Sequence, residues 1–175
     1  MPMRLNTSNI REWADNLKCR DEVLLSGVVY TARDAAHKKI VALIESGKEL
    51  PFELKDSVIY YAGPTPAKEG RICGAFGPTT AGRMDYYPQL FDNGLAAAIG
   101  KGDRSKNIIE ALVRNKSLYF IAIGGAGALA AKHIKSCEEI AFAELGCESV
   151  KRLIFDDFPL IVAIDTEGND IFKKQ

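Results

Sequence analysis

The chain has 175 residues, of which 47% are hydrophobic and 26% are charged, and its 23 basic side chains balance 23 acidic ones. That length is enough for a core of its own, because a chain of about 150 residues buries roughly 68–70% of its unfolded surface. The zero net charge provides no overall field to attract nucleic acid or an anionic membrane, which favours a small molecule or a protein as the partner. We therefore expect a single domain over residues 1–175, with residues 1–20 as an N-terminal extension.

The sequence carries neither a targeting pattern nor a metal-binding pattern. Its first residues lack the apolar core of a signal peptide, and no segment approaches the ~20 apolar residues that span a membrane, so we expect a cytoplasmic protein. Four cysteines lie far apart without a C-x-x-C pair, namely Cys19, Cys73, Cys137 and Cys147. We interpret them as free core thiols and expect no metal ligand on this chain.

A short helix and a strand are the first expected elements. Residues 10–17 have apolar side chains at helical spacing, with Ser8 or Asn9 as the cap, and predict a docked terminal helix. Residues 22–31 are rich in β-branched and apolar side chains around Gly27. This pattern predicts either two strands or one strand that bends at the glycine.

A strand-to-helix junction follows. Asp34 is the expected N-cap of a helix that ends at Gly47, because apolar residues recur between them at helical spacing. Arg33 precedes this helix at the end that favours an anion, although a solvated loop charge is the alternative. His37 lies one turn further on, and we interpret it as a histidine that is hydrogen-bonded in the helix surface.

The most distinctive stretch is Gly77-Pro78-Thr79-Thr80-Ala81-Gly82-Arg83-Met84-Asp85. Residues 72–76 form an apolar run before it, which predicts a buried strand that ends in a polar turn. The glycines allow close backbone approach, and Thr79 or Thr80 can cap a following helix whose free N–H groups point outward. Such a turn is typical of an anion site.

Two cations stand at or near such turns. Arg83 lies in the first turn of the helix expected after Thr80, where a cation opposes the helix dipole at a cost of about 0.3–1 kcal/mol. An anionic ligand would offset that cost, whereas a solvent-facing arginine on an ordinary capped helix explains the same residues. Lys101 lies between two glycines and could reach a carboxylate or phosphate, with a plain exposed turn as the alternative.

The remaining segments alternate between strands and helices. Residues from 124 to Cys147 are expected to be helical, and Gly125-Ala126-Gly127-Ala128-Leu129-Ala130 has the form of a dinucleotide fingerprint. Close packing of a helix against a strand explains these small residues as well, and we favour it. The other expected elements are strands at 57–62, 117–123, 150–155 and 160–165, turns at 63–66 and 167–169, and helices at 88–92 and 105–113. Together they predict an α/β domain with a mixed sheet and flanking helices.

Five junction motifs occur in order along the chain, namely Tyr30-Thr31-Ala32-Arg33-Asp34-Ala35-Ala36-His37, Gly63-Pro64-Thr65-Pro66, the stretch from Gly77 to Asp85, Ile99-Gly100-Lys101-Gly102 and Asp157-Phe158-Pro159. Their combination, from about Val23 to Phe172, resembles the β subunit of the iron–sulfur (class I) fumarate hydratases and L-tartrate dehydratases. In one-chain members of that family, the same region is the C-terminal domain. The resemblance implies a swivelling-type β/β/α domain that closes over a separate α region.

In that family the α region holds a [4Fe–4S] cluster. The resemblance therefore implies an α-subunit partner, a heterotetramer of two α and two β subunits, and a cluster that the α subunit carries and this chain does not. The open iron of the cluster would act as a Lewis acid on the leaving hydroxyl group.

The resemblance also implies residue roles. Arg33, Arg83 and Lys101 would hold the two carboxylates of a C4 dicarboxylate substrate, since arginine forks and a lysine point charge suit such groups. Thr79 would occupy the catalytic hydroxyl position, and Thr80 would bind substrate beside it.

These implications lead to one hypothesis and two alternatives. The leading hypothesis is the β subunit of a two-subunit hydro-lyase that reversibly hydrates fumarate to (S)-malate. The alternatives are an L-tartrate dehydratase β subunit, which gives oxaloacetate, and a non-catalytic domain that binds a dicarboxylate or phosphate. The sequence leaves fumarate and tartrate open, because the partner subunit can supply the contacts that distinguish a hydroxyl-bearing substrate.

Overall fold

The computed structural model describes residues 1–122 and 130–173. Its strands are β1 (Met3–Asn6), β2 (Glu22–Thr31), β3 (Val58–Tyr60), β4 (Ala97–Gly100), β5 (Leu118–Ala122), β6 (Ile134–Ala141) and β7 (Val150–Ile164). The α-helices are α1 (Ile10–Trp13), α2 (Asp34–Glu45), α3 (Gln89–Asp92) and α4 (Lys106–Asn115). The 3-10 helices are η1 (Thr7–Asn9), η2 (Ala14–Asn16), η3 (Ala81–Met84) and η4 (Ala143–Glu148).

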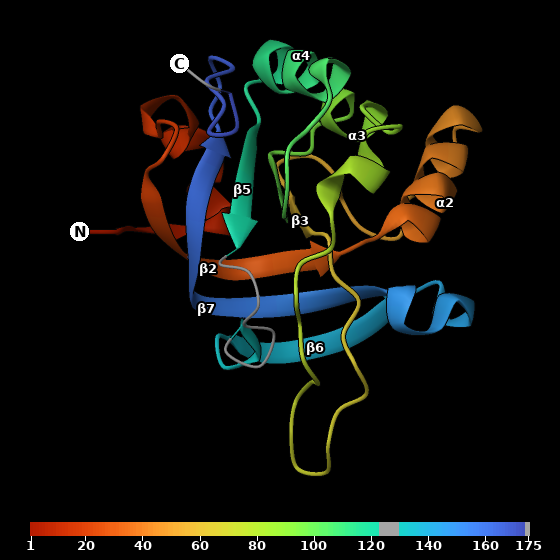
Figure 1. Cartoon of the computed structure of the whole chain (residues 1–175). Coiled ribbons are helices and arrows are strands. Elements are labelled where there is room, and N and C mark those ends of the chain that lie inside the picture. The colour runs from red at the N-terminus through yellow and green to blue at the C-terminus, as the bar shows by residue number, and fades with distance from the viewer. Residues whose placement is uncertain (123–129, 174–175) are drawn as a thin grey trace.

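The strands form one mixed sheet in the order β1-β2-β3-β4-β5-β7-β6 (Figure 1). Neighbours from β1 to β5 run parallel, whereas β7 is antiparallel to β2, β5 and β6. Because β7 pairs with both β5 and β2, the strands β2, β3, β4, β5 and β7 close into a barrel. The strands β1 and β6 extend this barrel at β2 and at β7. The expected mixed sheet with flanking helices is therefore confirmed.

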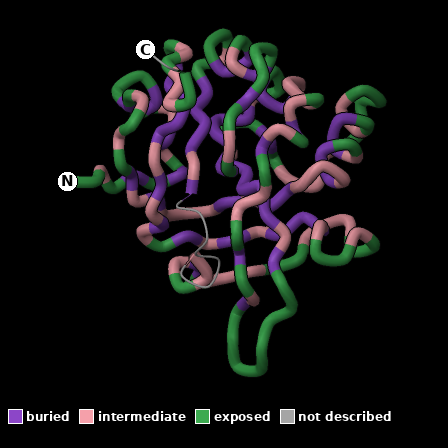
Figure 2. Tube along the Cα trace, in the orientation of Figure 1, coloured by how far each residue is buried: buried purple, intermediate pink, exposed green. Residues whose placement is uncertain are grey.

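Successive residues of β3, β4 and β5 face two different cores. Tyr60 and Phe120 belong to a buried cluster that receives side chains from all five barrel strands, so this cluster fills the barrel interior. Their neighbours Tyr61 and Tyr119 belong to a second cluster, which also contains Ile40 of α2. The second cluster lies between the sheet and the helices α2, α3 and α4, whose inner sides are buried (Figure 2). Both faces of the parallel strands are thus covered, as parallel sheets require.

Several expected elements are present. The helices expected after residues 33, 88 and 105 are α2, α3 and α4, and the strands expected at 57–62 and 117–123 are β3 and β5. The segment 22–31 is one strand, with a register shift between Leu25 and Gly27 where it pairs with β7. Gly27 has a φ of 109°, which favours glycine, so the alternative of a single bent strand is the one observed.

The strand expected at residues 72–76 is absent. These residues belong to a loop that leaves β3 and extends past β6 (Figure 1), and the outer part of the loop is exposed (Figure 2). Ile72 is 54% exposed, while Cys73 and Phe76 are buried in the barrel-interior cluster. The apolar run is therefore explained by Cys73 and Phe76, which anchor the loop to the core. It forms no strand because no neighbouring strand pairs with it.

The helix expected up to Cys147 is also wrong. In its described part, residues 134–141 form the edge strand β6, which pairs with β7, and η4 is interrupted by Gly146 in a non-helical conformation. An edge strand keeps many polar side chains, so residues 134–141 show no clear alternation that would distinguish them from a helix. Most of the stretch Gly125 to Ala130 lies outside the described residues.

The two strands expected at 150–155 and 160–165 are one continuous strand, β7. Asp157, with a φ of 47°, sits where the pairing with β2 shifts register, and its N–H donates to the Ser26 hydroxyl at 2.9 Å. Pro159 pairs with Leu24. The proline is tolerated beside this irregularity, so it does not end the strand.

The termini and caps differ in detail from the expectation. Residues 3–6, within the expected N-terminal extension, pair with β2, and the terminal helix is a short α-helix between two 3-10 turns. Asn9, one of the two expected caps, is the N-cap of α1 but makes no side-chain capping bond, whereas Asn6 caps η1 by accepting from the Ser8 N–H. Arg33 rather than Asp34 is the N-cap of α2. Trp13 is 38% exposed, so it lies outside the buried face of its helix. Within the described ranges, every helix is too short or too polar to cross a membrane.

Candidate active site

The carboxyl ends of the parallel strands β2, β3 and β4 lie at one edge of the sheet. Arg33 follows β2, Tyr61 follows β3 and Lys101 follows β4. Pairing continues just beyond the strand ends, where the N–H of Tyr61 donates to the Ile99 carbonyl at 2.8 Å. The beginnings of these three connections are therefore held side by side.

The Thr79–Thr80 segment is bonded to this edge. The N–H of Thr79 donates to the Tyr61 carbonyl at 2.6 Å, and the N–H of Lys101 donates to the Thr79 carbonyl at 3.2 Å. The N–H of Ala81 in turn donates to the Lys101 carbonyl at 2.8 Å, so Thr80 and Lys101 form a parallel bridge. The structure thus places Thr79, Thr80 and Lys101 next to one another, although 20 residues separate Thr80 from Lys101 along the chain.

Gly100 makes this approach possible. A Cβ atom at Gly100 would lie 2.8 Å from the Tyr61 ring and 3.3 Å from the Thr79 carbonyl oxygen. The first distance is shorter than side chains tolerate, so only glycine allows the β4 turn to lie against the Thr79 segment. Gly77 and Gly82 have open space around them, so no close approach requires these two glycines.

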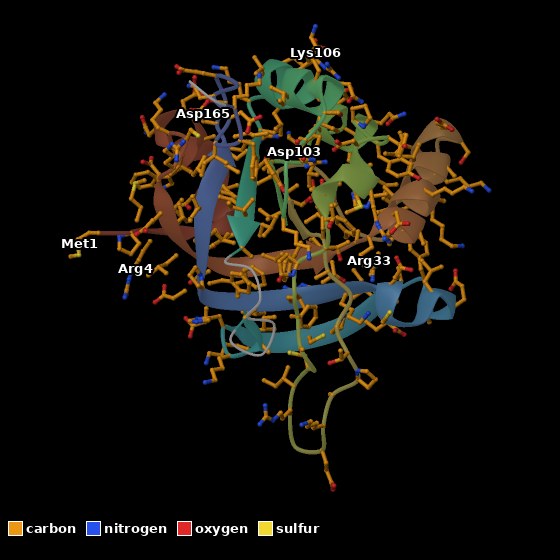
Figure 3. All side chains as sticks on the ribbon, in the orientation of Figure 1. Met1, Arg4, Arg33, Asp103, Lys106 and Asp165 are labelled. Carbon is orange, nitrogen blue, oxygen red and sulfur yellow. The ribbon has the colours of Figure 1, made fainter. Side chains whose placement is uncertain are left out.

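Arg33 lies at the same edge, beside η4 (Figure 3). Its side chain is half-buried, and its Nε atom is 3.5 Å from Oε1 of Glu148, without a hydrogen bond between them. A Cβ atom on Gly63 would lie 3.3 Å from Arg33 Cδ and 2.9 Å from the Cys147 carbonyl oxygen. The guanidinium is therefore confined between the turn after β3 and η4, with a carboxylate facing its Nε side.

Arg83 occupies a different position from the one expected. It lies in the last turn of the four-residue helix η3, whose N-cap Thr80 makes no side-chain capping bond. The helix is too short to oppose a cation with a substantial dipole, so the expected cost of placing Arg83 there does not arise. Arg83 and Lys101 are both exposed, and within the described ranges neither forms an ion pair.

A buried arginine, Arg104, lies beneath these residues and was not among the site residues expected from the sequence. The side chain of Arg104 is fully buried, and its Nε donates to Oδ1 of Asp85 at 2.7 Å. Its guanidinium carbon lies 5.2 Å from the ring centre of Tyr61 and 4.8 Å from that of Tyr119, which are cation–π distances. Arg104 follows the Gly-Lys-Gly turn as part of a polar run, and nothing local distinguishes it from an exposed loop charge.

His37 is hydrogen-bonded, as expected, but it is buried rather than on the helix surface. Its Nδ1 lies 2.8 Å from the Arg33 carbonyl oxygen, which can only accept, so Nδ1 carries the proton and donates. Burial lowers the pKa of His37 to about 4, and the nearby Arg104 charge acts in the same direction. His37 is therefore neutral near pH 7 and holds the backbone of Arg33 rather than serving as a charge.

The cysteines and histidines bring no metal-binding group together in the described part of the chain. Cys73 is buried, Cys19 and Cys137 are half-buried, and Cys147 is exposed, so the interpretation as core thiols is correct for Cys73 alone. All four are free thiols, as expected. Cys73, Cys137 and Cys147 share the lining of one cavity of about 290 Å³.

The carboxyl edge offers positive groups and hydroxyls, and Glu148 beside Arg33 is the one carboxylate that forms an ion pair with them in the described part of the chain. Arg33 presents a guanidinium, Arg83 and Lys101 add exposed cations, and the hydroxyls of Thr79 and Thr80 form no hydrogen bond with another described residue. Planar guanidinium groups bind carboxylates through two parallel hydrogen bonds, and an ammonium group adds a point charge. This arrangement suits a small anion with more than one carboxylate.

Comparison with known sequences gives relatives that are named fumarate hydratase or L(+)-tartrate dehydratase subunit beta. Fumarate hydratase 2 of Leishmania major is 41% identical over 94% of this chain, and the anaerobic class I fumarate hydratase of Escherichia coli strain K12 is 42% identical over 86%. The chain spans only 30% and 28% of the length of these two proteins. The putative L(+)-tartrate dehydratase subunit beta of Methanocaldococcus jannaschii is 39% identical over 90% of this chain and 85% of its own length.

The family described as Fumarase C-terminus matches residues 1–175. The match covers every motif that led to the resemblance, from Tyr30 to Pro159. This chain therefore belongs to the fumarase C-terminus family.

Proposed function

We propose that this chain is the β subunit of a two-subunit iron–sulfur hydro-lyase that reversibly hydrates fumarate to (S)-malate. Membership of the family and the relatives named fumarate hydratase support this activity. The observation that carries the proposal is the backbone bonding of Thr79 and Ala81 to Lys101, which pairs Thr80 with Lys101 at the carboxyl edge. It supports the proposal because two threonines and a lysine are then neighbours in the backbone, and their side chains are of the kinds that bind a dicarboxylate.

In this proposal Arg33, Arg83 and Lys101 bind the carboxylates of the C4 substrate. Arg33 uses its terminal nitrogens, because its Nε faces Glu148. Arg83 and Lys101 have no competing ion pair in the described part of the chain, so binding a carboxylate costs them no existing partner. Their exposure also means that a subunit closing over this edge would exclude water from the site and strengthen these contacts.

Thr79 is proposed as the catalytic hydroxyl and Thr80 as a substrate contact. The backbone of Thr79 is held at both sides by the bonds to Tyr61 and Lys101. Its hydroxyl can therefore be aimed reproducibly at the substrate. A threonine hydroxyl is a poor base alone, so proton transfer at its Oγ1 needs a second group, which we assign to the partner subunit.

The [4Fe–4S] cluster is assigned to a separate α subunit, together with the heterotetramer of two α and two β chains. The relatives that this chain matches over most of their length are named β subunits, which supports a partner. The residues described in this chain do not fit an iron–sulfur cluster, because none of its cysteines belongs to a group of three or more possible metal ligands. A single swivelling-type domain over residues 1–175, with residues 1–20 as an extension, and a cytoplasmic location complete the proposal.

L-tartrate dehydration is the second candidate function. It is favoured by the L(+)-tartrate dehydratase subunit beta of Escherichia coli strain K12, which is 33% identical over 97% of this chain and 86% of its own length. The two reactions share a C4 dicarboxylate and differ in one hydroxyl group, so the same cations serve both. A domain that binds a dicarboxylate or phosphate without chemistry is the alternative from another class.

The test is reconstitution with a co-expressed α subunit, followed by assays of fumarate hydration and L-tartrate dehydration on the same preparation. We expect the complex to turn over fumarate, and the isolated chain to be inactive and to bind no stoichiometric iron. Turnover of tartrate alone would select the second candidate. If the isolated chain binds a dicarboxylate tightly and the α subunit adds no turnover, the enzyme proposal is wrong.

A further inference from the structure

Arg104 is a buried cation that the proposed chemistry leaves unused. Its side chain has no exposed surface, yet Nη1 and Nη2 have no hydrogen-bond partner among the described residues. Burying an unpaired charged group is costly, so such a residue calls for an explanation beyond ordinary packing. One carboxylate, that of Asp85, bonds to its Nε.

The Arg104–Asp85 pair joins the two segments that carry Arg83 and Lys101, two of the residues proposed to bind the substrate carboxylates. Asp85 directly follows η3, two residues after Arg83, and Arg104 lies three residues after Lys101. Oδ2 of Asp85 also accepts the N–H of Ser105 at 2.8 Å. The carboxylate is thus shared between two donors that belong to the turn after β4.

Aromatic side chains of β5 and of the connection after β3 also hold this pair in position. The guanidinium lies over the rings of Tyr61 and Tyr119, and the Tyr119 hydroxyl donates to the Gly102 carbonyl at 2.8 Å. Arg104 therefore connects the strand ends, the Lys101 turn and the end of η3 in one buried cluster. A shift of its guanidinium would move these elements relative to one another, because packed interiors do not deform gradually.

We propose that Arg104 is a positioning residue: paired with Asp85 and stacked on Tyr61 and Tyr119, it sets the spacing between Arg83 and Lys101. The inference rests on the proposed function, in which those two cations bind substrate carboxylates.

The test uses two substitutions of Arg104 and a matched control. Arg104→Met keeps the length of the side chain but removes the charge, and Arg104→Lys keeps the charge but loses the planar fork. Arg114 is the control, because its Nε lies 2.7 Å from Oδ1 of Asp92, the same distance as between Arg104 Nε and Asp85 Oδ1, yet its side chain is 50% exposed and its Nη2 also bonds to Asp92. Arg114→Met therefore removes an arginine–aspartate pair that lies away from the carboxyl edge.

Kinetics of the reconstituted complex give the first readout. We expect Arg104→Met to lower kcat/KM at least tenfold, mainly through a higher KM, and Arg104→Lys to recover part of the loss. Arg114→Met should leave kcat and KM unchanged. A merely structural arginine would lower the Tm without raising KM at a temperature well below it, so wild-type KM in both Arg104 variants overturns the proposal. If Arg104→Met does not fold, the KM of Arg104→Lys decides.

Hydrogen exchange on the chain itself gives a readout that does not need turnover. The amides of Ala81 and Lys101, which bond the two segments together, should exchange at least tenfold faster in the Arg104 variants and normally in Arg114→Met. If the wild-type complex is inactive, the proposed function fails, and the exchange rates still decide whether Arg104 holds the two segments. Unchanged exchange at both amides overturns the positioning role whether or not the complex is active.

Discussion

Cations in the helical layer around α3 and α4 are paired with carboxylates or carbonyls. At the carboxyl edge of β2, β3 and β4, two exposed cations lack such partners among the described residues. In the helical layer, Arg114 forms two hydrogen bonds to Asp92, at 2.7 and 2.8 Å. Arg11 donates to Asp56 and to three backbone carbonyls, those of Asn115, Lys116 and Gly94, at 2.9–3.0 Å. At the carboxyl edge, Arg83 and Lys101 have no such partner within the described ranges.

The difference distinguishes cations that stabilise the fold from cations that are available to bind a ligand. A guanidinium that bonds to carbonyls of two segments and to the Asp56 carboxylate stabilises the packing of these segments, and its replacement should affect stability. An exposed cation beside two unpaired hydroxyls contributes little to stability, and its replacement should affect binding.

The largest expected effect concerns His37, the buried neutral base at the carboxyl edge. Its pKa is about 4 in the folded protein and 6.5 in an unfolded chain. Between these values only the unfolded chain takes up the proton, so stability is complete above pH 6.5 and falls as the pH decreases toward 4. We expect the wild type to lose roughly 2–3 kcal/mol more than His37→Asn between about pH 7 and about pH 4.5.

Urea unfolding of both proteins at the two pH values measures this difference. His37→Asn retains a donor near the position of Nδ1, which limits the damage at pH 7. Equal pH dependence in the two proteins would show that His37 is not held neutral, and that the edge contains a titrating cation instead.

The second effect is that of Arg83→Lys, which keeps the charge and removes the fork. If Arg83 binds a substrate carboxylate through two hydrogen bonds, the reconstituted complex should lose about 1.5–3 kcal/mol of transition-state stabilisation, or roughly ten- to a hundredfold in kcat/KM. Stability should hardly change, because Arg83 is exposed. Wild-type kcat/KM with normal assembly would show that Arg83, like Arg114, does not bind the substrate.

The third effect is expected in the helical layer. Arg11→Lys cannot reproduce the bonds to Asp56 and to three carbonyls, so it should cost about 1–2 kcal/mol of unfolding free energy. Its control, Arg114→Lys, should cost less than about 0.5 kcal/mol, because that pair is exposed. Denaturant unfolding measures both. A loss of kcat/KM in Arg11→Lys without a loss of stability would contradict the division between the two regions.

The smallest effect is that of Glu148→Gln. The glutamine has nearly the same shape, but the negative charge beside Arg33 Nε at the proposed anion site is gone. We expect KM for the dicarboxylate to fall about two- to threefold, which corresponds to less than about 1 kcal/mol at a partly exposed pair. An increased KM would mean that the charge of Glu148 is needed to orient Arg33.

Local patterns in the sequence were sufficient for some elements and for several proposed site residues. The helices α2 and α4 follow from apolar spacing within single turns, and Gly27 marks the bend in β2. The junction motifs that contain Arg33, Thr79 and Lys101 could be recognised because glycine, proline and hydroxyl side chains cluster where a strand ends. Their residue roles remain a prediction.

Only the tertiary structure decided the elements that depend on distant partners. β6 is a strand because β7 provides its ladder, and β7 continues through Pro159 because β2 pairs with it on both sides of Asp157. The run at 72–76 stays a loop because it has no neighbouring strand. The burial of Arg104 and His37 likewise depends on aromatic rings from β3 and β5 and from their connections. Hydrogen-bond ladders and desolvation are set by which segments meet in space, and a single sequence reports only spacing along the chain.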